Sequence, residues 1–305
     1  MIPTSSMKRK GPWLELTIPQ RELTMSLQGD QELLARWLIS EMGMPAKLLK
    51  KLYGQKAIVW QDTRLLIQLF PDEAPSFEPV WMDLDVLYED DFCLVVNKRA
   101  GLAVHPTSPE QTDTLAHGLA SYYASTGQAC KVRPIHRLDR DTSGGLLYAK
   151  NEWAQLQLDE AMRTQRVERH YIAVVEGKMK AKRGTIDQSI GRDRHHASRQ
   201  RISTTGKEAI THFQCKLKQP QASLVELELE TGRTHQIRVH MSHLGHPLIG
   251  DELYGAKPHT LNRQALHASR LRFPHPLTGE WVEVQSPWPE DLRALAEVYF
   301  PQQML

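Results

Sequence analysis

One short polar segment, HRLDRDTSGG at positions 136–145, has the residue types needed for acid–base or nucleophilic chemistry. It places Asp139 between Arg137 and Arg140 and ends in Thr, Ser and two glycines. A carboxylate close to a guanidinium is stabilised in its ionised form. An ionised aspartate can act as a nucleophile, and it can equally form a plain surface ion pair. The segment therefore predicts either a reactive carboxylate or a local salt-bridge cluster.

A second segment, TGRTHQIRVHMSHLGHPLIGD at positions 231–251, is rich in His and Arg. Its apolar spacing predicts a helix that is capped by Thr234 and ends at Leu244, because Gly245 follows. The residues expected to face the core are Ile237, Met241 and Leu244. Those expected to share another face are His235, Arg238 and Ser242. Because Gly232 and Arg233 precede this helix, its N-terminus is also suited to a phosphate group.

Four histidines of this segment, at positions 235, 240, 243 and 246, raise the alternative of a metal site. Histidines 235 and 240 are five residues apart and would point in different directions on a helix. No HExxH pattern or comparable carboxylate accompanies them. Contacts to RNA or packing are the preferred interpretations, and no metal site is predicted.

Charge is distributed unevenly along the chain. Lys and Arg number 38 against 36 Asp and Glu, so the net charge by itself does not indicate a nucleic-acid partner. Positions 178–201, however, hold eight basic residues and two acids, whereas positions 71–91 hold eight acids and no Lys or Arg. A local basic patch can bind phosphates even when the net charge is small. A solvated basic loop is the simpler alternative.

Composition also indicates the setting in which the protein works. Its three cysteines are isolated, which suggests neither a disulfide framework nor a CxxC metal site and fits a reducing compartment. No apolar run approaches membrane-spanning length, and no apolar stretch follows the basic N-terminal residues. We expect a cytoplasmic protein without a membrane partner, acting as a monomer.

The elements that must position these residues follow from periodicity. Near the N-terminus we predict two helices, at 31–44 and 45–54, and a hairpin formed by AIVW and LLIQLF. Further along we predict strands at CLVV, GLLYAK, HYIAVVEG and LVELELE, and a helix capped by Asn151. The domain prediction is a small N-terminal α/β module at 1–75, a linker at 76–83 and a catalytic domain at 84–305.

This order of elements predicts the fold class. The strands lack regular βαβ spacing, which favours an α+β fold on a mostly antiparallel, mixed sheet with flanking helices. No GxGxxG or GxxxxGKS motif is present, so the phosphate-binding turns of nucleotide-cofactor folds are missing. A doubly wound parallel sheet is the weaker alternative.

Taken together, six segments resemble the RluA-type family of RNA pseudouridine synthases. HRLDRDTSGGLLYAK looks like the catalytic signature of that family. The accompanying segments are VVNKRAGLAVHP, YIAVVEG, GKEAITHF, TGRTHQIRVHMSHLGHPLIGDELYG and LHASRLRFPHP. They extend from about Leu94 to Pro276. The N-terminal module resembles, more faintly, a degenerate alpha-L RNA-binding module.

The resemblance implies cofactor-free isomerisation of a uridine within RNA, in the pseudouridine synthase fold. Asp139 would be the essential carboxylate, which either attacks the anomeric carbon of ribose or assists formation of a glycal. Arg238 matches the arginine that pairs with this carboxylate, and Tyr171 matches the tyrosine that stacks on the uracil. On sequence pattern alone, Tyr171 would be an ordinary strand aromatic. Arg137 matches the arginine that enters the space left by the flipped nucleotide.

The remaining residues expected to bind substrate are His136, Thr142, Gly144, Arg233, His235 and Leu266. Gly144 is expected to leave room for backbone close to the substrate. Ribosomal RNA is the preferred substrate, with transfer RNA as the alternative. A non-catalytic RNA-binding relative is the competing class of protein, and a histidine-based metal hydrolase is a third.

Three departures from the family pattern are visible. Arg99 stands where NKPAG would have proline, and Arg169 stands where a lysine typically precedes the tyrosine by two residues. The N-terminal hairpin has Asp62 and Thr63 instead of Asn-Gly. None of these changes touches a predicted catalytic position. The last of them leaves the RNA affinity of the module in doubt.

Overall fold

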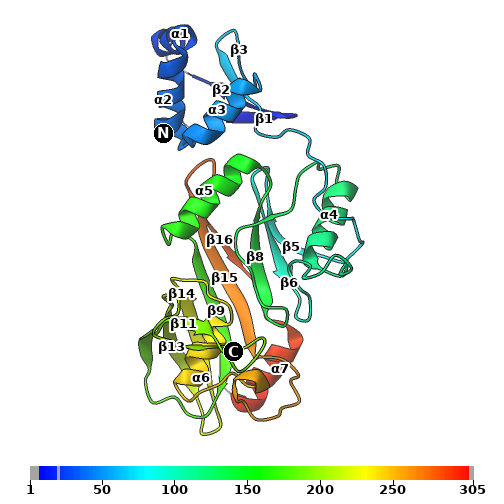
Figure 1. Cartoon of the computed structure of the whole chain (residues 1–305), viewed down its shortest axis with the longest axis vertical. Coiled ribbons are helices and arrows are strands. Elements are labelled where there is room, and N and C mark those ends of the chain that lie inside the picture. The colour runs from blue at the N-terminus through cyan, green and yellow to red at the C-terminus, as the bar shows by residue number, and fades with distance from the viewer. Residues whose placement is uncertain (1–6, 19–20, 302–305) are drawn as a thin grey trace.

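Two β-sheets of different size organise the chain, and the segment 68–84 connects them (Figure 1). The computed structural model describes residues 7–18 and 21–301. The smaller sheet is antiparallel, in the order β1-β2-β4-β3. Its strands are β1 (Met7–Lys10), β2 (Trp13–Thr17), β3 (Ile58–Gln61) and β4 (Arg64–Ile67). Its helices are α1 (Arg21–Gly29), α2 (Gln31–Met42) and α3 (Ala46–Gly54).

Local sequence explains both ends of α2. The Asp30 side chain accepts hydrogen bonds from the backbone N–H groups of Glu32 and Leu33, which caps the start of α2. Gly43 ends the helix in the left-handed conformation, at φ 59°. The two predicted helices and the predicted hairpin are confirmed, whereas β1, β2 and α1 were not anticipated.

The larger sheet runs in the order β10-β13-β14-β9-β15-β8-β6-β5, with β16 beside β15 and β7 beside β8. Its first strands are β5 (Asp85–Glu89), β6 (Cys93–Lys98), β7 (Arg133–Pro134), β8 (Ser143–Ala149) and β9 (Glu168–Glu176). Its later strands are β10 (Arg183–Asp187), β13 (Ile210–Lys218), β14 (Ala222–Leu229), β15 (Leu266–Pro274) and β16 (Trp281–Gln285). A separate hairpin pairs β11 (Ile190–Arg192) with β12 (Gln200–Ile202).

Helices cover both faces of this sheet (Figure 1). They are α4 (Leu115–Ser125), α5 (Glu152–Arg163), α6 (Gln236–His243) and α7 (Glu290–Tyr299). Successive strand residues point to opposite faces. Tyr171 and Ala173 therefore share a core with α4 and α6, whereas Ile172 and Val174 pack with α7. The predicted α+β class with a mostly antiparallel, mixed sheet is confirmed.

Gly144 permits the junction at which the sheet becomes mixed. The pair of β8 and β15 is parallel and begins at Ser143 and Gly144. Gly144 has φ +115°, and a Cβ atom there would lie 2.2 Å from the carbonyl oxygen of Ala268. The close approach that needs this glycine is thus made by the backbone of β15. The predicted role of Gly144 next to substrate stays a prediction.

The N-terminal module packs directly on the larger sheet and α5. One apolar cluster runs from the module into the catalytic part of the chain and includes Phe70, Phe92 and Trp153. Polar contacts reinforce it, since Arg9 pairs with Asp91 at 2.6 Å and Lys51 pairs with Glu152. The packing across the segment 68–84 is therefore continuous, and the domain boundaries drawn from the sequence stay a prediction.

Among residues 7–18 and 21–301, no helix combines the length and the apolar character that crossing a membrane requires.

We predict that Gly144→Ala lowers the free energy of unfolding by about 3 kcal/mol or more, because a backbone clash is added to an unfavourable φ. Gly127→Ala is the matched control, since Gly127 has φ +69° and nothing within 4 Å of its Cβ position. It should cost about 1–2 kcal/mol, the penalty of the left-handed conformation alone. Urea unfolding of both variants measures the difference, and equal losses would contradict the argument.

Candidate active site

Of the ten site residues predicted from the sequence, all but Gly144 line one cavity of about 390 Å³. The lining also includes Arg163, Arg169, Gly232 and Gln236. The volume lies within the range of small-ligand pockets, roughly 300–1,000 Å³. The fold therefore brings four distant segments together, namely the loop before β8, the middle of β9, the start of α6 and the start of β15.

Arg238 is the centre of the site. It is 8% exposed, and its Nε and Nη2 atoms donate to the two carboxylate oxygens of Asp251 at 2.7 and 2.8 Å. Its Nη1 atom donates to Oδ2 of Asp139 at 3.4 Å. A guanidinium offers its donors in a rigid plane, so the paired bonds to Asp251 fix the direction of the remaining donor. Arg238 therefore presents one N–H to Asp139.

The charge of Arg238 is maintained despite burial. Burial by itself lowers the pKa of this guanidinium, but the hydrogen bond and negative charge of Asp251 outweigh it, aided by Asp139, and raise the pKa. A buried cation without such partners would cost several kcal/mol. Asp251, which is 2% exposed, supplies the main compensation.

Sequence reasoning missed Asp251. It stands at the end of the second motif, thirteen residues after Arg238, and follows Gly250, which has φ +78°. A Cβ atom at Gly250 would lie 2.2 Å from the carbonyl oxygen of Arg263. The sequence offered one signal, since an arginine that becomes buried must pair with a carboxylate. It did not show which carboxylate, because that depends on the three-dimensional arrangement.

Lys98 holds the loop that carries Asp139. It is 1% exposed, and its Nζ atom donates to the carbonyl oxygens of Arg99, Leu102 and Arg140 at 3.0, 2.8 and 2.7 Å. Burial lowers the pKa of Lys98 to about 7. Arg99 takes part through its backbone carbonyl, which proline would also supply. The departure at this position therefore leaves the contact intact.

Tyr171 and Arg169 form the floor of the cavity on β9. Tyr171 is 4% exposed, and burial raises the pKa of its phenol, so the group is uncharged at neutral pH. The Nη2 atom of Arg169 donates to the carbonyl oxygens of three consecutive residues, 229–231. Its Nη1 atom would lie 2.8 Å from a Cβ atom at Gly232. Arg169 therefore supports the turn that leads into α6.

The start of α6 differs from the prediction. The helix begins at Gln236, and the N-cap residue is His235, at φ 56°, rather than Thr234. The Gln236 backbone N–H, one of the donors that a Thr234 cap would bind, instead donates to the Arg233 carbonyl at 3.1 Å, and the Gln236 Oε1 accepts from the Arg233 backbone N–H at 2.9 Å. Leu244 is 39% exposed, so its predicted core position is also wrong.

The other predicted substrate-binding residues differ in exposure. Arg137 and Arg233 are exposed at the rim, and the Arg233 Nε donates to the Glu208 carbonyl at 2.7 Å. Thr142 and Leu266 are buried in the cavity wall. Burial and the charge of Arg169 lower the pKa of His136 to about 3, so this imidazole is neutral.

Of the four histidines that raised the alternative of a metal site, three have separate partners and the fourth, His243, is exposed. The two ring nitrogens of His240 face the Thr211 hydroxyl and the Gln188 carbonyl, each at 2.9 Å. The Nδ1 atom of His246 lies 2.8 Å from the Glu176 carbonyl. Because the rings of His235, His240 and His246 are oriented by different parts of the fold, their nitrogens do not converge on one point. The packing interpretation is the one these contacts support.

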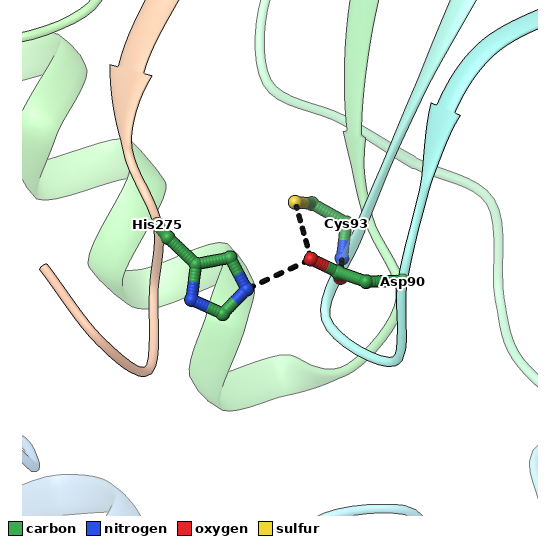
Figure 2. A group of neighbouring side chains, drawn as sticks. All are labelled: Asp90, Cys93 and His275. Atoms are coloured by element: carbon green, nitrogen blue, oxygen red, sulfur yellow. Dashed lines mark hydrogen bonds and ion pairs between the residues drawn. The ribbon is translucent and has the colours of Figure 1, made fainter. Parts of the chain in front are cut away.

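A different cluster, Asp90, Cys93 and His275, has the spacing of metal ligands (Figure 2). The Nδ1 atom of His275 accepts from the backbone N–H groups of Leu277 and Thr278, so its Nε2 carries the proton and donates to Asp90 at 2.8 Å. Burial and the charge of Asp90 raise the pKa of the Cys93 thiol. Both of these protons would have to be released before a metal ion could bind. The cluster instead ties the β5–β6 turn to the end of β15.

Comparison with known proteins identifies the family. The family model described as RNA pseudouridylate synthase matches residues 92–243. The uncharacterized RNA pseudouridine synthase YhcT of Bacillus subtilis (strain 168) is 42% identical over 304 residues, which is 96% of this chain and all of that protein. The chain therefore belongs to the RNA pseudouridine synthases and is an isomerase that acts on uridines of RNA. The resemblance to the RluA-type family is confirmed.

Two further relatives are informative. The ribosomal large subunit pseudouridine synthase D of Haemophilus ducreyi is 37% identical over 253 residues, covering 78% of each chain. Among solved structures, the human RNA pseudouridylate synthase domain containing 1 is 32% identical. It superposes with a TM-score of 0.55 over 68% of this chain and 84% of its own.

We predict that Asp251→Ala lowers the free energy of unfolding by about 3–5 kcal/mol, because a buried arginine loses its bidentate partner. Asp141→Ala is the matched control, since Asp141 pairs with exposed Arg140 at 3.2 Å. A surface pair of this kind contributes less than about 1 kcal/mol. Guanidinium unfolding measures both variants, and a loss of similar size in the two would show that Asp251 does not compensate Arg238.

Proposed function

We propose that this protein converts uridines of large-subunit ribosomal RNA to pseudouridine, with Asp139 as the essential carboxylate. The observation that carries the proposal is the contact between Asp139 and Arg238 inside a cavity. The synthase D of Haemophilus ducreyi, by its name an enzyme of the large ribosomal subunit, supports the choice of substrate.

In this proposal the reaction begins at Asp139. Its carboxylate either attacks the anomeric carbon of the ribose or assists removal of a proton so that a glycal forms, and uracil is detached in both cases. Arg238 directs the carboxylate through its N–H donor and positive charge while the cavity limits access of water. The uracil then turns and rejoins the ribose through a ring carbon. The product contains the same atoms as the substrate, so this reaction needs no cofactor.

Tyr171 lines the cavity, which supports a contact with the base. A uridine within structured RNA must be flipped out of its stack, at a cost of a few kcal/mol. Stacking on an aromatic ring returns about 1–3 kcal/mol of this cost. We propose that Tyr171 supplies that surface on the cavity floor. Its uncharged phenol can also donate a hydrogen bond to the base.

The arginines at the cavity rim suit the RNA backbone. Arg137 and Arg233 are exposed, and neither has a carboxylate partner among the described residues. We propose that Arg137 enters the space left by the flipped nucleotide, because a guanidinium can stack and donate hydrogen bonds at once. Arg233 would contact a neighbouring phosphate. His136, Thr142, His235 and Leu266 would shape the cavity around the ribose and base.

The proposed substrate also suggests where in the cell the protein works. An enzyme of ribosomal RNA works in the cytoplasm of a bacterial cell, and we propose that location here. The monomeric state stays a prediction. Transfer RNA is the alternative substrate and becomes one outcome of the test below.

We predict that deleting the gene removes pseudouridine from specific positions of large-subunit ribosomal RNA, as mapped by chemical labelling and sequencing of cellular RNA. Wild-type protein should restore these positions, whereas Asp139→Asn should not, because a carboxamide is neither a nucleophile nor a base. Asp141→Asn, in the same loop but outside the cavity, is the matched control and should restore them.

Three results would contradict parts of this account. Loss confined to transfer RNA would replace the substrate. Restoration by Asp139→Asn would remove Asp139 from its role. A modification map unchanged by the deletion would refute the proposed activity on cellular RNA.

A further inference from the structure

Tyr254 lies directly behind the active site and contacts two of its residues. It belongs to a single 3₁₀ turn, Glu252–Tyr254, and is 7% exposed. The guanidinium carbon of Arg238 lies 4.9 Å from the centre of its ring. Its hydroxyl oxygen lies 2.8 Å from Nδ1 of His235. Tyr254 is thus next to both groups that face Asp139, although it does not line the cavity itself.

The direction of the hydrogen bonds at the Tyr254 hydroxyl is determined by its second partner. The backbone N–H of Gln200 donates to this oxygen at 2.9 Å. The hydroxyl proton is then free to go to Nδ1 of His235, which must act as the acceptor. If Nδ1 carried a proton instead, the hydroxyl would accept twice, and its own proton would lack a partner among these contacts.

The protonation of both groups at neutral pH agrees with this direction. Burial raises the pKa of Tyr254 to about 12, so the phenol keeps its proton. Burial lowers the pKa of His235, an effect that the negative charge of Asp139 only partly offsets, so the imidazole is neutral. A neutral imidazole that accepts at Nδ1 carries its proton on Nε2.

This tautomer directs an N–H group toward Asp139. The Nε2 atom of His235 lies 3.9 Å from Oδ2 of Asp139, the same oxygen that faces Arg238. Hydrogen bonds of catalytic groups are often long without substrate and shorten in the complex. His235 also adopts φ 56°, a conformation that costs about 1–2 kcal/mol in a residue with a Cβ atom. Strain of this kind is concentrated at functional sites.

The backbone N–H that donates to the Tyr254 hydroxyl belongs to the basic segment at positions 178–201. Gln200 is the first residue of β12, in a hairpin whose exposed cations include Arg192, Arg194 and Arg201. The hairpin packs on α6 through a small apolar cluster formed by Ile190, Ala209, Val239 and Tyr254. A surface suited to RNA phosphates is therefore connected to Asp139 through one backbone N–H, one tyrosine and one histidine.

We propose that Tyr254 is a positioning residue whose hydroxyl, held by the Gln200 backbone, fixes the His235 tautomer so that Nε2–H faces Asp139. This inference rests on the proposed role of Asp139. Under it, the His235 N–H is a second donor to the carboxylate beside Arg238. The simpler alternative is that the Tyr254 hydroxyl only attaches the hairpin to α6.

The test uses Tyr254→Phe in the full chain, which keeps the ring beside Arg238 and removes only the hydroxyl. Selective ¹⁵N labelling of histidine reports the tautomer of each ring through its two nitrogen shifts, and the loss of signals in His235→Gln assigns His235. We predict the Nε2–H tautomer in the wild type and a mixture of tautomers in Tyr254→Phe. Single-turnover isomerisation of an RNA substrate should slow about 10- to 100-fold, with RNA affinity within about twofold.

Tyr122→Phe is the matched control, because the Tyr122 hydroxyl donates to Glu89 at 2.6 Å, away from the site. It should change neither the His235 shifts nor the rate. An unchanged His235 tautomer in Tyr254→Phe, or an unchanged rate, would overturn the proposal and leave Tyr254 with an attachment role. The tautomer is read in the free protein, so it tests the hydrogen-bond chain even if the RNA substrate proposed above is wrong.

Discussion

The burial of the Arg238 guanidinium is the constraint on which the site depends. A buried cation is tolerated only when carboxylates and hydrogen bonds replace the water it has lost. Asp251 supplies two of these bonds, and the geometry of the fork leaves one N–H directed at Asp139. The orientation of the Asp139 carboxylate, the proposed catalytic group, is therefore a consequence of how a structural charge is compensated.

The fold meets this constraint by joining segments that are far apart in the sequence. Asp139 lies on the loop before β8, which Lys98 holds through backbone carbonyls. Arg238 lies on α6, which shares an apolar core with β9 and α4. The parallel contact of β8 with β15 requires glycine at position 144. Each of these features helps to determine where a proposed catalytic residue lies.

The residues that could be predicted from the sequence are those whose expected role follows from their own side chain. Asp139, Tyr171 and Arg238 were recognisable from motifs, and the alternation of LVELELE was sufficient to predict β14. Residues whose importance comes from a partner were missed, as Asp251 and Tyr254 illustrate. The close approach of the Ala268 backbone to Gly144 was not predicted either, because the two residues lie far apart in the sequence. The predicted Thr234 cap was wrong because the helix starts one residue later, after His235, and the Gln236 backbone N–H donates to the Arg233 carbonyl.

The central claim is that Arg238 acts through its planar geometry and not through its charge alone. Arg238→Lys tests this most directly, because lysine keeps the positive charge but cannot bind Asp251 through two atoms and face Asp139 at the same time. The measurement is the single-turnover rate of uridine isomerisation at saturating enzyme. The account predicts a loss of about 100-fold or more with RNA affinity nearly unchanged. A rate close to that of the wild type would contradict it.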